Sequence, residues 1–350
     1  MAALTSAGLS DLVEAAARPE ARPSAAQLLP VTAAAEGLHR LERLLVSAAR
    51  AGPRGLAPAA EALLRSGGKR VRPLLTLLAA RAAAPGRRSR GRVALAVVAE
   101  LVHSATLLHD DVIDHSHLRR GHPTVNSRWG SSLSILVGDF LYAKAMALVV
   151  DDGDPQILKE ITRVTMRMTE GQVMETLKIG DTGLTGAEYR QIIRQKTAAL
   201  FGACCYIGAV LGGLPAERSE ALRRFGITFG SAFQLVDDAL DFTGKEQRLG
   251  KPVGSDLREG KVTLPVIITL QHASPEESAT IDRFVRGDDR SPETFQDIVA
   301  LIQRYNGIEY ALREAERYIE QAELELQGFA DGPAYDLLME LADFIVKREV

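Results

Sequence analysis

The sequence predicts an all-α protein. Apolar residues recur at the three- and four-residue spacing of amphipathic helices, as Leu38, Leu41 and Leu45 illustrate. No run of Val, Ile and Thr alternates with a period of two, so no sheet is expected. With 46% hydrophobic residues, the 350-residue chain can bury a large core, as one large helical domain or two smaller ones.

Glycine, proline and aspartate separate the expected helices. The alanine-rich residues 1–28, with prolines at 19 and 23, are expected to form a flexible extension. The stretch 66–73 is a Gly-rich basic break that opens a helix with Pro73 near its start. The pattern predicts a helix at about 32–50, a short helix that ends at about 65, the helix that Pro73 opens, and a long helix from about 93 through 114. Further helices are predicted at about 131–150, 155–178, 185–212, 216–243, 261–272, 275–286, 293–304, 308–327 and 333–348.

Composition excludes several classes of protein. The net charge of −3 does not favour nucleic acid as a partner. Cys204 and Cys205 are adjacent in an apolar helical run, which indicates core thiols and a reducing compartment. The N-terminus lacks the basic region of a signal peptide, and the longest apolar runs contain charges such as Glu100 and Asp139. We therefore expect a soluble, cytoplasmic protein.

Two acidic triplets stand inside otherwise apolar helices. They are Asp110-Asp111-x-x-Asp114 and Asp237-Asp238-x-x-Asp241. Residues four apart share a helix face, so the carboxylates of each triplet repel one another unless a cation lies among them. One triplet alone could equally be a surface patch. Two, each followed by basic residues, favour a site between two helices that holds Mg²⁺ and a diphosphate.

Basic residues accompany the triplets. Arg119 and Arg120 follow the first, while Lys251 and Lys261 follow the second. Each alone is compatible with a solvated surface, but together they suit phosphate oxygens. The segment 67–72 contains Lys69, Arg70 and Arg72 and lacks the spacing of a P-loop, so it would hold a second diphosphate by charge alone.

Five polar residues interrupt helices that otherwise read as buried: Gln172, Glu175, Lys196, Thr197 and Gln234. Singly, each is as compatible with a hydrogen-bonded core group as with a functional one. Gln172 and Glu175 are three apart, and Gln234 and Asp238 are four apart, so each pair shares one helix face.

Taken together, these motifs resemble the trans-isoprenyl diphosphate synthase family, most closely its long-chain, octaprenyl- and nonaprenyl-type bacterial branch. They occur in the family's order over about residues 35 to 348. The matching elements are Gly67-Gly68-Lys69-Arg70-Val71-Arg72-Pro73, His103, Asp110-Asp111-x-x-Asp114 with Arg119-Arg120-Gly121, Gly171-Gln172-x-x-Glu175, Lys196-Thr197, and Phe233-Gln234-x-x-Asp237-Asp238-x-x-Asp241 with Gly250-Lys251 and Lys261.

The resemblance implies a fold and an activity. The fold would be a single-domain bundle of antiparallel helices around a central active-site cavity, with 29–350 as the catalytic domain, usually in a homodimer. The activity would be that of a prenyltransferase that condenses isopentenyl diphosphate sequentially onto an allylic diphosphate, farnesyl or geranylgeranyl. The product would be a long all-trans chain, for example for a respiratory quinone. Its release could involve peripheral contact with a membrane.

The resemblance also assigns roles. About two to three Mg²⁺ ions would be coordinated by carboxylates, namely Asp110, Asp111, Asp114, Asp237 and Asp241. The catalytic set would add Asp238, Lys196 and Lys251. Arg119, Lys196 and Lys251 would bind the allylic diphosphate, and Lys261 would also bind substrate. Lys69, Arg72, His103 and Arg120 would bind isopentenyl diphosphate without metal, and Thr197 and Gln234 would line the reaction centre. Many long-chain members carry Glu then Gln at positions 172 and 175, which leaves open whether Glu175 reaches a metal.

Product length would depend on the residues just before the first triplet. In the resembled family a bulky aromatic there closes the floor of the tunnel, whereas Ala105 and Thr106 are small. The helix extends roughly 25 Å below the aspartates at about 1.5 Å per residue, and Met146 would face it, so we expect a product of about C35 to C50.

Other interpretations remain open at this point. The tunnel residues could be plain core, and the enzyme could be a short-chain synthase with a product of about C15 to C20. The chain could also be a subunit of a heteromeric synthase, although such subunits usually lose aspartates. A terpene cyclase would normally lack the second aspartate triplet and the basic segment 67–72.

Overall fold

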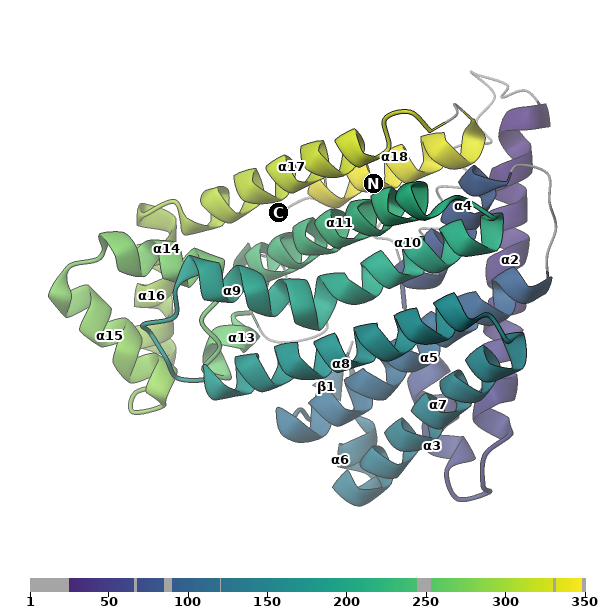
Figure 1. Ribbon diagram of the computed structural model, residues 1–350. Helices are drawn as coiled ribbons and strands as arrows, with labels where there is room; N and C mark the ends of the chain where they lie inside the picture. The colour runs from purple at the N-terminus through teal and green to yellow at the C-terminus, as the bar shows by residue number, and fades with distance from the viewer. Residues whose placement is uncertain are drawn as a thin grey trace. The chain divides into compact units, whose positions relative to one another are not determined.

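The computed structural model describes residues 25–65, 68–84, 90–119, 121–243, 253–329 and 332–347, and they are almost entirely helical (Figure 1). The first half contains α2 (Ala25–Arg50), α3 (Ala57–Arg65), α4 (Val71–Ala83), α5 (Arg90–Ile113), α6 (Val125–Trp129), α7 (Ser131–Asp152) and α8 (Pro155–Leu177). The second half contains α9 (Gly186–Ile193), the π-helix η1 (Arg194–Ala198), α10 (Ala199–Gly212), α11 (Ala216–Thr243), α13 (Ser255–Arg258), α14 (Leu264–His272), α15 (Pro275–Arg286), α16 (Pro292–Arg304), α17 (Gly307–Glu325) and α18 (Pro333–Val346). The all-α prediction is confirmed.

Four details differ from the sequence-based expectation. Helix α2 already begins at Ala25, so residues 25–28 do not belong to an extension. A two-stranded antiparallel hairpin, β1 (Leu118–Arg119) and β2 (His122–Pro123), follows the first triplet. Its strands are too short to show an alternating pattern. The stretch expected as one helix over 185–212 contains the π-helix η1, and the four-residue α13 is too short for a periodic signal.

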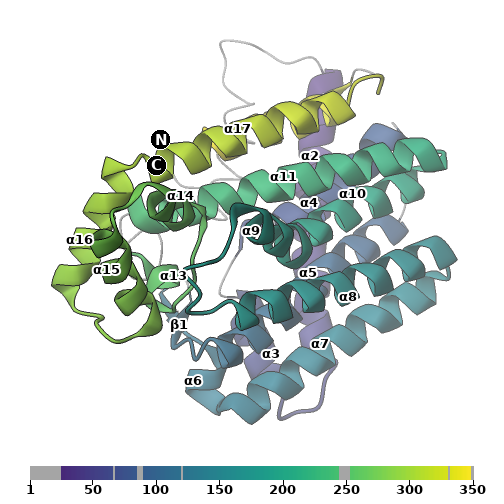
Figure 2. The same cartoon turned by 60° about the vertical axis from the view of Figure 1, so that its left-hand side comes forward.

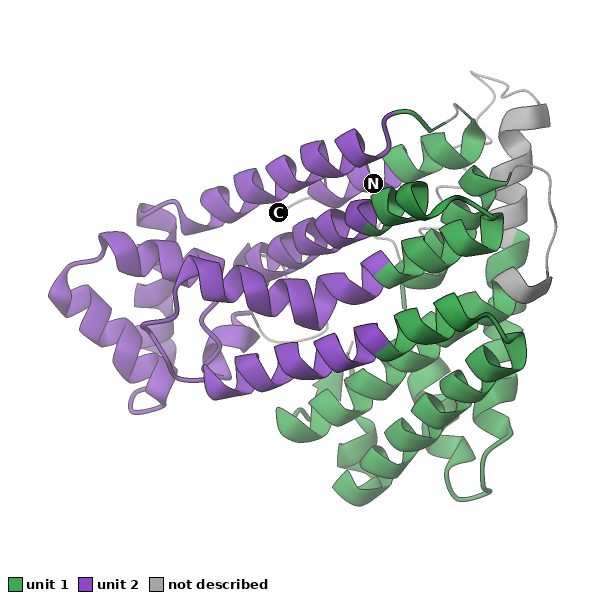
Figure 3. Ribbon diagram, viewed as in Figure 1, with its two compact units in different colours: residues 1–162, 203–223, 328–339 green, residues 163–202, 224–327, 340–350 purple. Residues whose placement is uncertain are grey.

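The chain divides into two compact units (Figure 3). Unit 1 comprises Met1–Thr162, Ala203–Arg223 and Gly328–Met339, and unit 2 comprises Arg163–Gly202, Arg224–Gln327 and Glu340–Val350. The first aspartate triplet therefore belongs to unit 1 and the second to unit 2. That residues 29–350 act as one catalytic domain stays a prediction.

Unit 1 is organised around α5, which packs against α2, α4 and α7. Most of its apolar residues are buried, including Leu95, Leu101 and Leu108. Figure 1 shows α5 and α7 running side by side. Helix α10 approaches α4 closely, because a Cβ atom at Gly208 would lie 2.5 Å from the carbonyl oxygen of Thr76. The predicted burial of Cys204 and Cys205 is confirmed, and burial raises the pKa of Cys204 to about 12.

Unit 2 has an aromatic core where α10 meets α11. The ring of Phe201 lies 5.5 Å from that of Phe229 and 5.3 Å from that of Phe233, centroid to centroid. Gly226 permits this approach, since a Cβ atom there would lie 2.5 Å from the carbonyl oxygen of Phe201. Figure 2 shows α14, α15 and α16 grouped together, and α14 also packs on α17.

Two of the described helices are long and apolar enough to cross a membrane by length and composition alone. The stretch Val93–Ile113 of α5 is 67% buried, which is typical of a core helix. The stretch Ser131–Asp152, which is α7, is only 33% buried. Helix α7 therefore presents a large apolar surface outside its own unit's core.

Candidate active site

The first aspartate triplet lies at the C-terminal end of α5, and Asp111 is its buried member. The side chain of Arg119 donates to one oxygen of Asp111, with Nε at 2.9 Å and Nη2 at 2.7 Å from Oδ1. Arg119 ends β1, the first strand of the hairpin that follows α5, and its guanidinium reaches back to the triplet. Among the described residues, none donates a hydrogen bond to Asp111 Oδ2, although this atom is buried.

Burial raises the pKa of Asp111, and the repulsion from Asp114 adds to this effect, while Arg119 opposes it. A buried carboxylate oxygen without a donor is the kind of ligand that a hard divalent cation takes. Asp110 and Asp114 belong to the same helix end, where the backbone N–H of Asp114 donates to the carbonyl oxygen of Asp110 at 2.8 Å.

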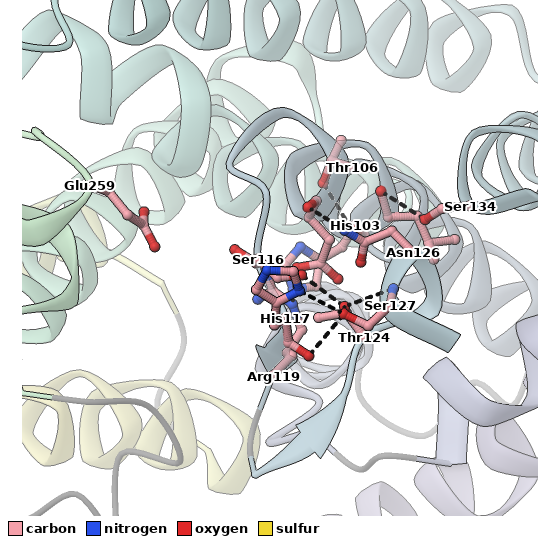
Figure 4. A network of polar contacts seen from close by, with 12 residues as sticks. His103, Thr106, Ser116, His117, Arg119, Thr124, Asn126, Ser127, Ser134 and Glu259 are labelled. Atoms are coloured by element: carbon pink, nitrogen blue, oxygen red, sulfur yellow. Dashed lines mark hydrogen bonds and ion pairs between the residues drawn. The ribbon is translucent and has the colours of Figure 1, made fainter. Parts of the chain in front are cut away.

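A polar network fixes the segment that carries Arg119 (Figure 4). The hydroxyl of Thr124, which caps α6, donates to the carbonyl oxygen of Ser116 at 2.8 Å. Ser127 Oγ donates to the carbonyl oxygen of His117 at 3.2 Å, and Asn126 Nδ2 donates to the carbonyl oxygen of Asp111 at 3.0 Å. The first two bonds tie the chain before β1 to the start of α6, and the third ties α6 to the end of α5, so the segment that carries Arg119 is held near the triplet.

The basic segment before α4 reaches α5 through Arg70. Arg70 Nη1 donates to Glu100 at 2.5 Å, and its Nε donates to Glu42 of α2 at 2.6 Å. Glu100 precedes His103 by three residues on α5, so the segment lies beside the turn that carries His103. Unit 1 thus brings together the regions of Lys69, Arg72 and His103, three residues predicted to bind isopentenyl diphosphate.

The sequence places Arg70 in a basic segment that is predicted to bind phosphate, yet in the structure its guanidinium is bonded to Glu42 and Glu100. The backbone of Arg70 is left-handed, with a φ of 46°. A residue other than glycine adopts this conformation only when its surroundings hold it there. The two glutamates lie 28 and 30 residues away in sequence, and no local pattern indicates the pairing.

We expect Arg70→Leu to lower the free energy of unfolding by about 3–5 kcal/mol, because it leaves the buried carboxylate of Glu100 without its partner. The side chains of Arg70 and Glu100 are only 9% and 7% exposed. Urea denaturation measures the loss. The matched control is Arg65→Leu, which breaks an exposed pair with Glu61 and should cost no more than about 1 kcal/mol. Equal losses in the two variants would contradict this account.

In unit 2, Lys196 and Glu175 form an ion pair. Lys196 lies in the π-helix η1, and such insertions are frequent at functional sites. Helix α8 packs directly on η1, because a Cβ atom at Gly171 would clash with the backbone nitrogen of Lys196. The carboxylate of Glu175 therefore has a lysine as its partner, and the neighbouring Gln172 has a buried Oε1 with no donor among the described residues.

The carboxylates of the second triplet differ in their hydrogen bonds. Tyr189 donates its hydroxyl to Asp238 Oδ2 at 2.5 Å, and Gln234 Nε2 donates to Asp238 Oδ1 at 2.7 Å. Burial, followed by repulsion from Asp256, raises the pKa of Asp238 to about 8. Both oxygens of Asp238 thus already have protein donors.

The remaining members of the second triplet differ from Asp238. Asp241 is buried and accepts from Ser255 Oγ at 3.0 Å and from the backbone N–H of Asp256 at 3.1 Å, so it anchors the segment around α13. Asp237 is half-buried.

The predicted basic residues are only partly described. Lys261 Nζ lies 2.9 Å from Glu259, whereas Arg120 and Lys251 lie outside the described residues. Within the described part of the chain, no three His, Cys, Asp or Glu side chains form a ready-made metal cluster.

The predicted chain-length residues lie on packed helices of unit 1. Ala105 is 3% exposed on α5, and Thr106 is half-buried with its hydroxyl donating to the carbonyl oxygen of His103 at 2.8 Å (Figure 4). Met146 is half-buried on α7, the helix that packs along α5. No phenylalanine, tyrosine or tryptophan occurs between residues 93 and 109.

Comparison with known proteins places this arrangement in a family. The family model described as Polyprenyl synthetase matches residues 53–302. The octaprenyl diphosphate synthase of Escherichia coli (strain K12) is 35% identical over 82% of this chain and 88% of its own length. The geranylgeranyl diphosphate synthase of Methanosarcina mazei is 37% identical over 85% of this chain and 91% of its own.

A solved structure agrees with these matches. The crystal structure of a polyprenyl synthase from Caulobacter crescentus CB15, complexed with calcium and isoprenyl diphosphate, superimposes with a TM-score of 0.87 at 38% identity. The match covers 94% of this chain and 100% of that one. With its own motifs in the family's order, and with relatives of this similarity over most of its length, the chain belongs to the polyprenyl synthetase family and is a trans-prenyl diphosphate synthase, a prenyltransferase.

Proposed function

We propose that this prenyltransferase adds isopentenyl diphosphate repeatedly to farnesyl or geranylgeranyl diphosphate and makes an all-trans product of about C35 to C50, for a use such as a respiratory quinone side chain. The observation that carries the chain-length part of the proposal is Ala105. It is small, buried and one and a half turns before Asp110 on a helix that lacks bulky aromatics over residues 93–109. The relatives include both octaprenyl and geranylgeranyl synthases, so similarity alone does not decide the length.

Divalent metal fits the aspartates of this chain. We propose that Asp110, Asp111 and Asp114, together with Asp237 and Asp241, hold Mg²⁺ on the allylic diphosphate. Bound there, Mg²⁺ would act as a Lewis acid that offsets the charge on the leaving diphosphate. The support is the donor set of hard oxygens and, above all, the buried Oδ2 of Asp111, for which no described residue supplies a proton.

The protein's own residues would perform the rest. Arg119, Lys196 and Lys251 would neutralise the allylic diphosphate, and Lys261 would also bind substrate. Lys69, Arg72, His103 and Arg120 would hold isopentenyl diphosphate. The allylic C1–O bond breaks and pyrophosphate leaves. The isopentenyl double bond then attacks C1, and the proton lost from the new unit passes to the departing pyrophosphate. Excluding water matters in this step because water would quench the cation.

Consumption of isopentenyl diphosphate by the purified chain tests this proposal. We expect radiolabel from isopentenyl diphosphate to enter a butanol-soluble product only when farnesyl or geranylgeranyl diphosphate and Mg²⁺ are both present, and EDTA should abolish the incorporation. A terpene cyclase would convert the allylic substrate without consuming isopentenyl diphosphate. A subunit of a heteromeric synthase would show no turnover alone.

We also propose that the protein is a homodimer whose partner covers α7. Four large apolar side chains of this helix are exposed in the single chain: Ile135, Leu136, Tyr142 and Val150. Several large apolar side chains exposed on one helix favour an interaction surface. A second copy of the chain is the occupant that the family resemblance implies.

Leu136→Glu is expected to weaken this dimer at least about tenfold, because it places a charge in an apolar interface. Leu136 is 54% exposed in the single chain. Light scattering coupled to size-exclusion chromatography over a range of concentrations measures the effect. The matched control is Leu324→Glu, since Leu324 is 59% exposed on α17 and should leave the dimer intact. A Leu136→Glu protein that dimerises as tightly as wild type would show that α7 is not the interface.

A further inference from the structure

The hydroxyl group of Tyr189 begins a buried chain of hydrogen bonds in unit 2. Tyr189 lies on α9, a helix whose start is held by a capping box between Thr185 and Glu188. Its side chain is 3% exposed, and its hydroxyl lies 2.5 Å from Asp238 Oδ2. None of the motifs described above includes this tyrosine.

The chain continues through two residues that are proposed to line the reaction centre. Gln234 Nε2 donates to Asp238 Oδ1 at 2.7 Å, and Thr197 Oγ1 donates to Gln234 Oε1 at 3.0 Å. Because Asp238 accepts a hydrogen bond from the amide nitrogen of Gln234, the amide oxygen of Gln234 points away from Asp238 and toward Thr197. The hydroxyl proton of Thr197 is then committed to Gln234, and its lone pairs remain as acceptors.

This arrangement makes Asp238 the link between two side chains. It is 3% exposed, and its two oxygens accept hydrogen bonds from Tyr189 and Gln234. Asp238 joins α9 to α11, and through Gln234 it is also joined to Thr197 in the π-helix η1.

We propose that Tyr189 is a positioning residue for the prenyl-transfer reaction: it fixes Asp238, which orients the Gln234 amide and, through it, the Thr197 hydroxyl. The inference rests on the proposed function in one respect, namely that Gln234 and Thr197 face the allylic carbon on which positive charge develops. Oxygen dipoles held rigidly in that direction stabilise the charge without having to reorganise during the reaction. Loss of the tyrosine hydroxyl would free the amide of Gln234 to rotate.

Tyr189→Phe tests this role, since it removes only the hydroxyl. We expect kcat to fall about tenfold, with the KM for both diphosphates within about twofold of wild type. The matched control is Tyr305→Phe, which removes a tyrosine–carboxylate hydrogen bond of 2.8 Å to Glu277 elsewhere in unit 2. It should leave kcat unchanged. A Tyr189→Phe enzyme with wild-type kcat would overturn the proposal.

A double-mutant cycle with Asp238→Asn asks whether Tyr189 acts through Asp238. In the Asp238→Asn background, Tyr189→Phe should lower kcat by less than about twofold, because the connection is already broken. A full additional tenfold loss would show that Tyr189 acts by another route.

A readout independent of turnover separates this inference from the proposed function. In protein labelled with ¹⁵N-glutamine, the side-chain amide signal of Gln234 is identified by its absence in Gln234→Glu. We expect it to shift in Tyr189→Phe and not in Tyr305→Phe. If wild type consumes no isopentenyl diphosphate, the proposed function fails, while this shift still reports whether Tyr189 orients Gln234. An unchanged signal would overturn the inference even in an active enzyme.

Discussion

Asp111→Asn is expected to lower kcat by about two to three orders of magnitude, equivalent to roughly 3–4 kcal/mol of lost stabilisation of the transition state. The substitution keeps the shape of the side chain and leaves an oxygen to accept from Arg119. It removes the negative charge and can present an NH₂ group where Oδ2 now lies without a donor among the described residues. Steady-state kinetics with saturating allylic and isopentenyl diphosphates measure the loss.

Stability separates a lost ligand from a damaged fold. Because burial raises the pKa of Asp111, its ionised form is less favourable in the folded than in the unfolded protein. The stability that the Asp111 carboxyl contributes to the folded protein therefore falls as pH rises through its raised pKa. A neutral Asn at this position should not lower Tm at neutral pH.

The Tm of wild type should rise on addition of Mg²⁺ with a diphosphate, and the Tm of Asp111→Asn should rise less. The control Asp151→Asn removes an exposed carboxylate of α7 and should match wild type in both assays. An active Asp111→Asn enzyme would remove this residue from the metal site.

Ala105→Phe is expected to shorten the product from about C35–C50 to about C20 or less, because the new ring lies about 7.5 Å along α5 from Asp110. The first condensations need only the space nearest the aspartates, so the rate of isopentenyl diphosphate consumption with a short primer should stay within about threefold of wild type. Mass spectrometry of the dephosphorylated products gives the chain-length distribution.

The graded variant Ala105→Val addresses the risk that a ring at a buried position disturbs packing. It adds less volume and should give products of intermediate length. Circular dichroism should show both variants folded. A folded Ala105→Phe enzyme with an unchanged product distribution would mean that Ala105 is ordinary core and does not limit the chain.

The helices were predictable because the residues that mark their ends act locally. Capping residues such as Ser274 and Ser291 and prolines at helix starts mark the ends, and the structure places α15 and α16 within a residue of expectation. The π-helix η1 was not predictable, since residues 194–198 contain no glycine or proline that would mark a change of helix type. The hairpin at 118–123 is set by contacts with the end of α5, which no periodicity reveals.

The candidate site was predictable in its residue types and less so in its pairings. The aspartate triplets are visible as repeated spacing, yet only the structure shows that Asp238 is bonded to Tyr189, 49 residues away. Arg70 reads as one more cation in a basic segment until Glu42 and Glu100 are seen beside it. A tyrosine in an amphipathic helix such as α9 gives no sign that its hydroxyl has a partner. Such long-range hydrogen bonds depend on tertiary packing, and local sequence does not encode them separately.

The length of the product that the unaltered enzyme makes distinguishes a long-chain from a short-chain synthase. The purified chain is incubated with farnesyl diphosphate, excess isopentenyl diphosphate and Mg²⁺, and the products are dephosphorylated and weighed by mass spectrometry. We expect a main all-trans product of about C35 to C50, as the long stretch of α5 below Asp110 without a bulky aromatic indicates. A main product of about C20 that does not lengthen with more isopentenyl diphosphate would contradict it.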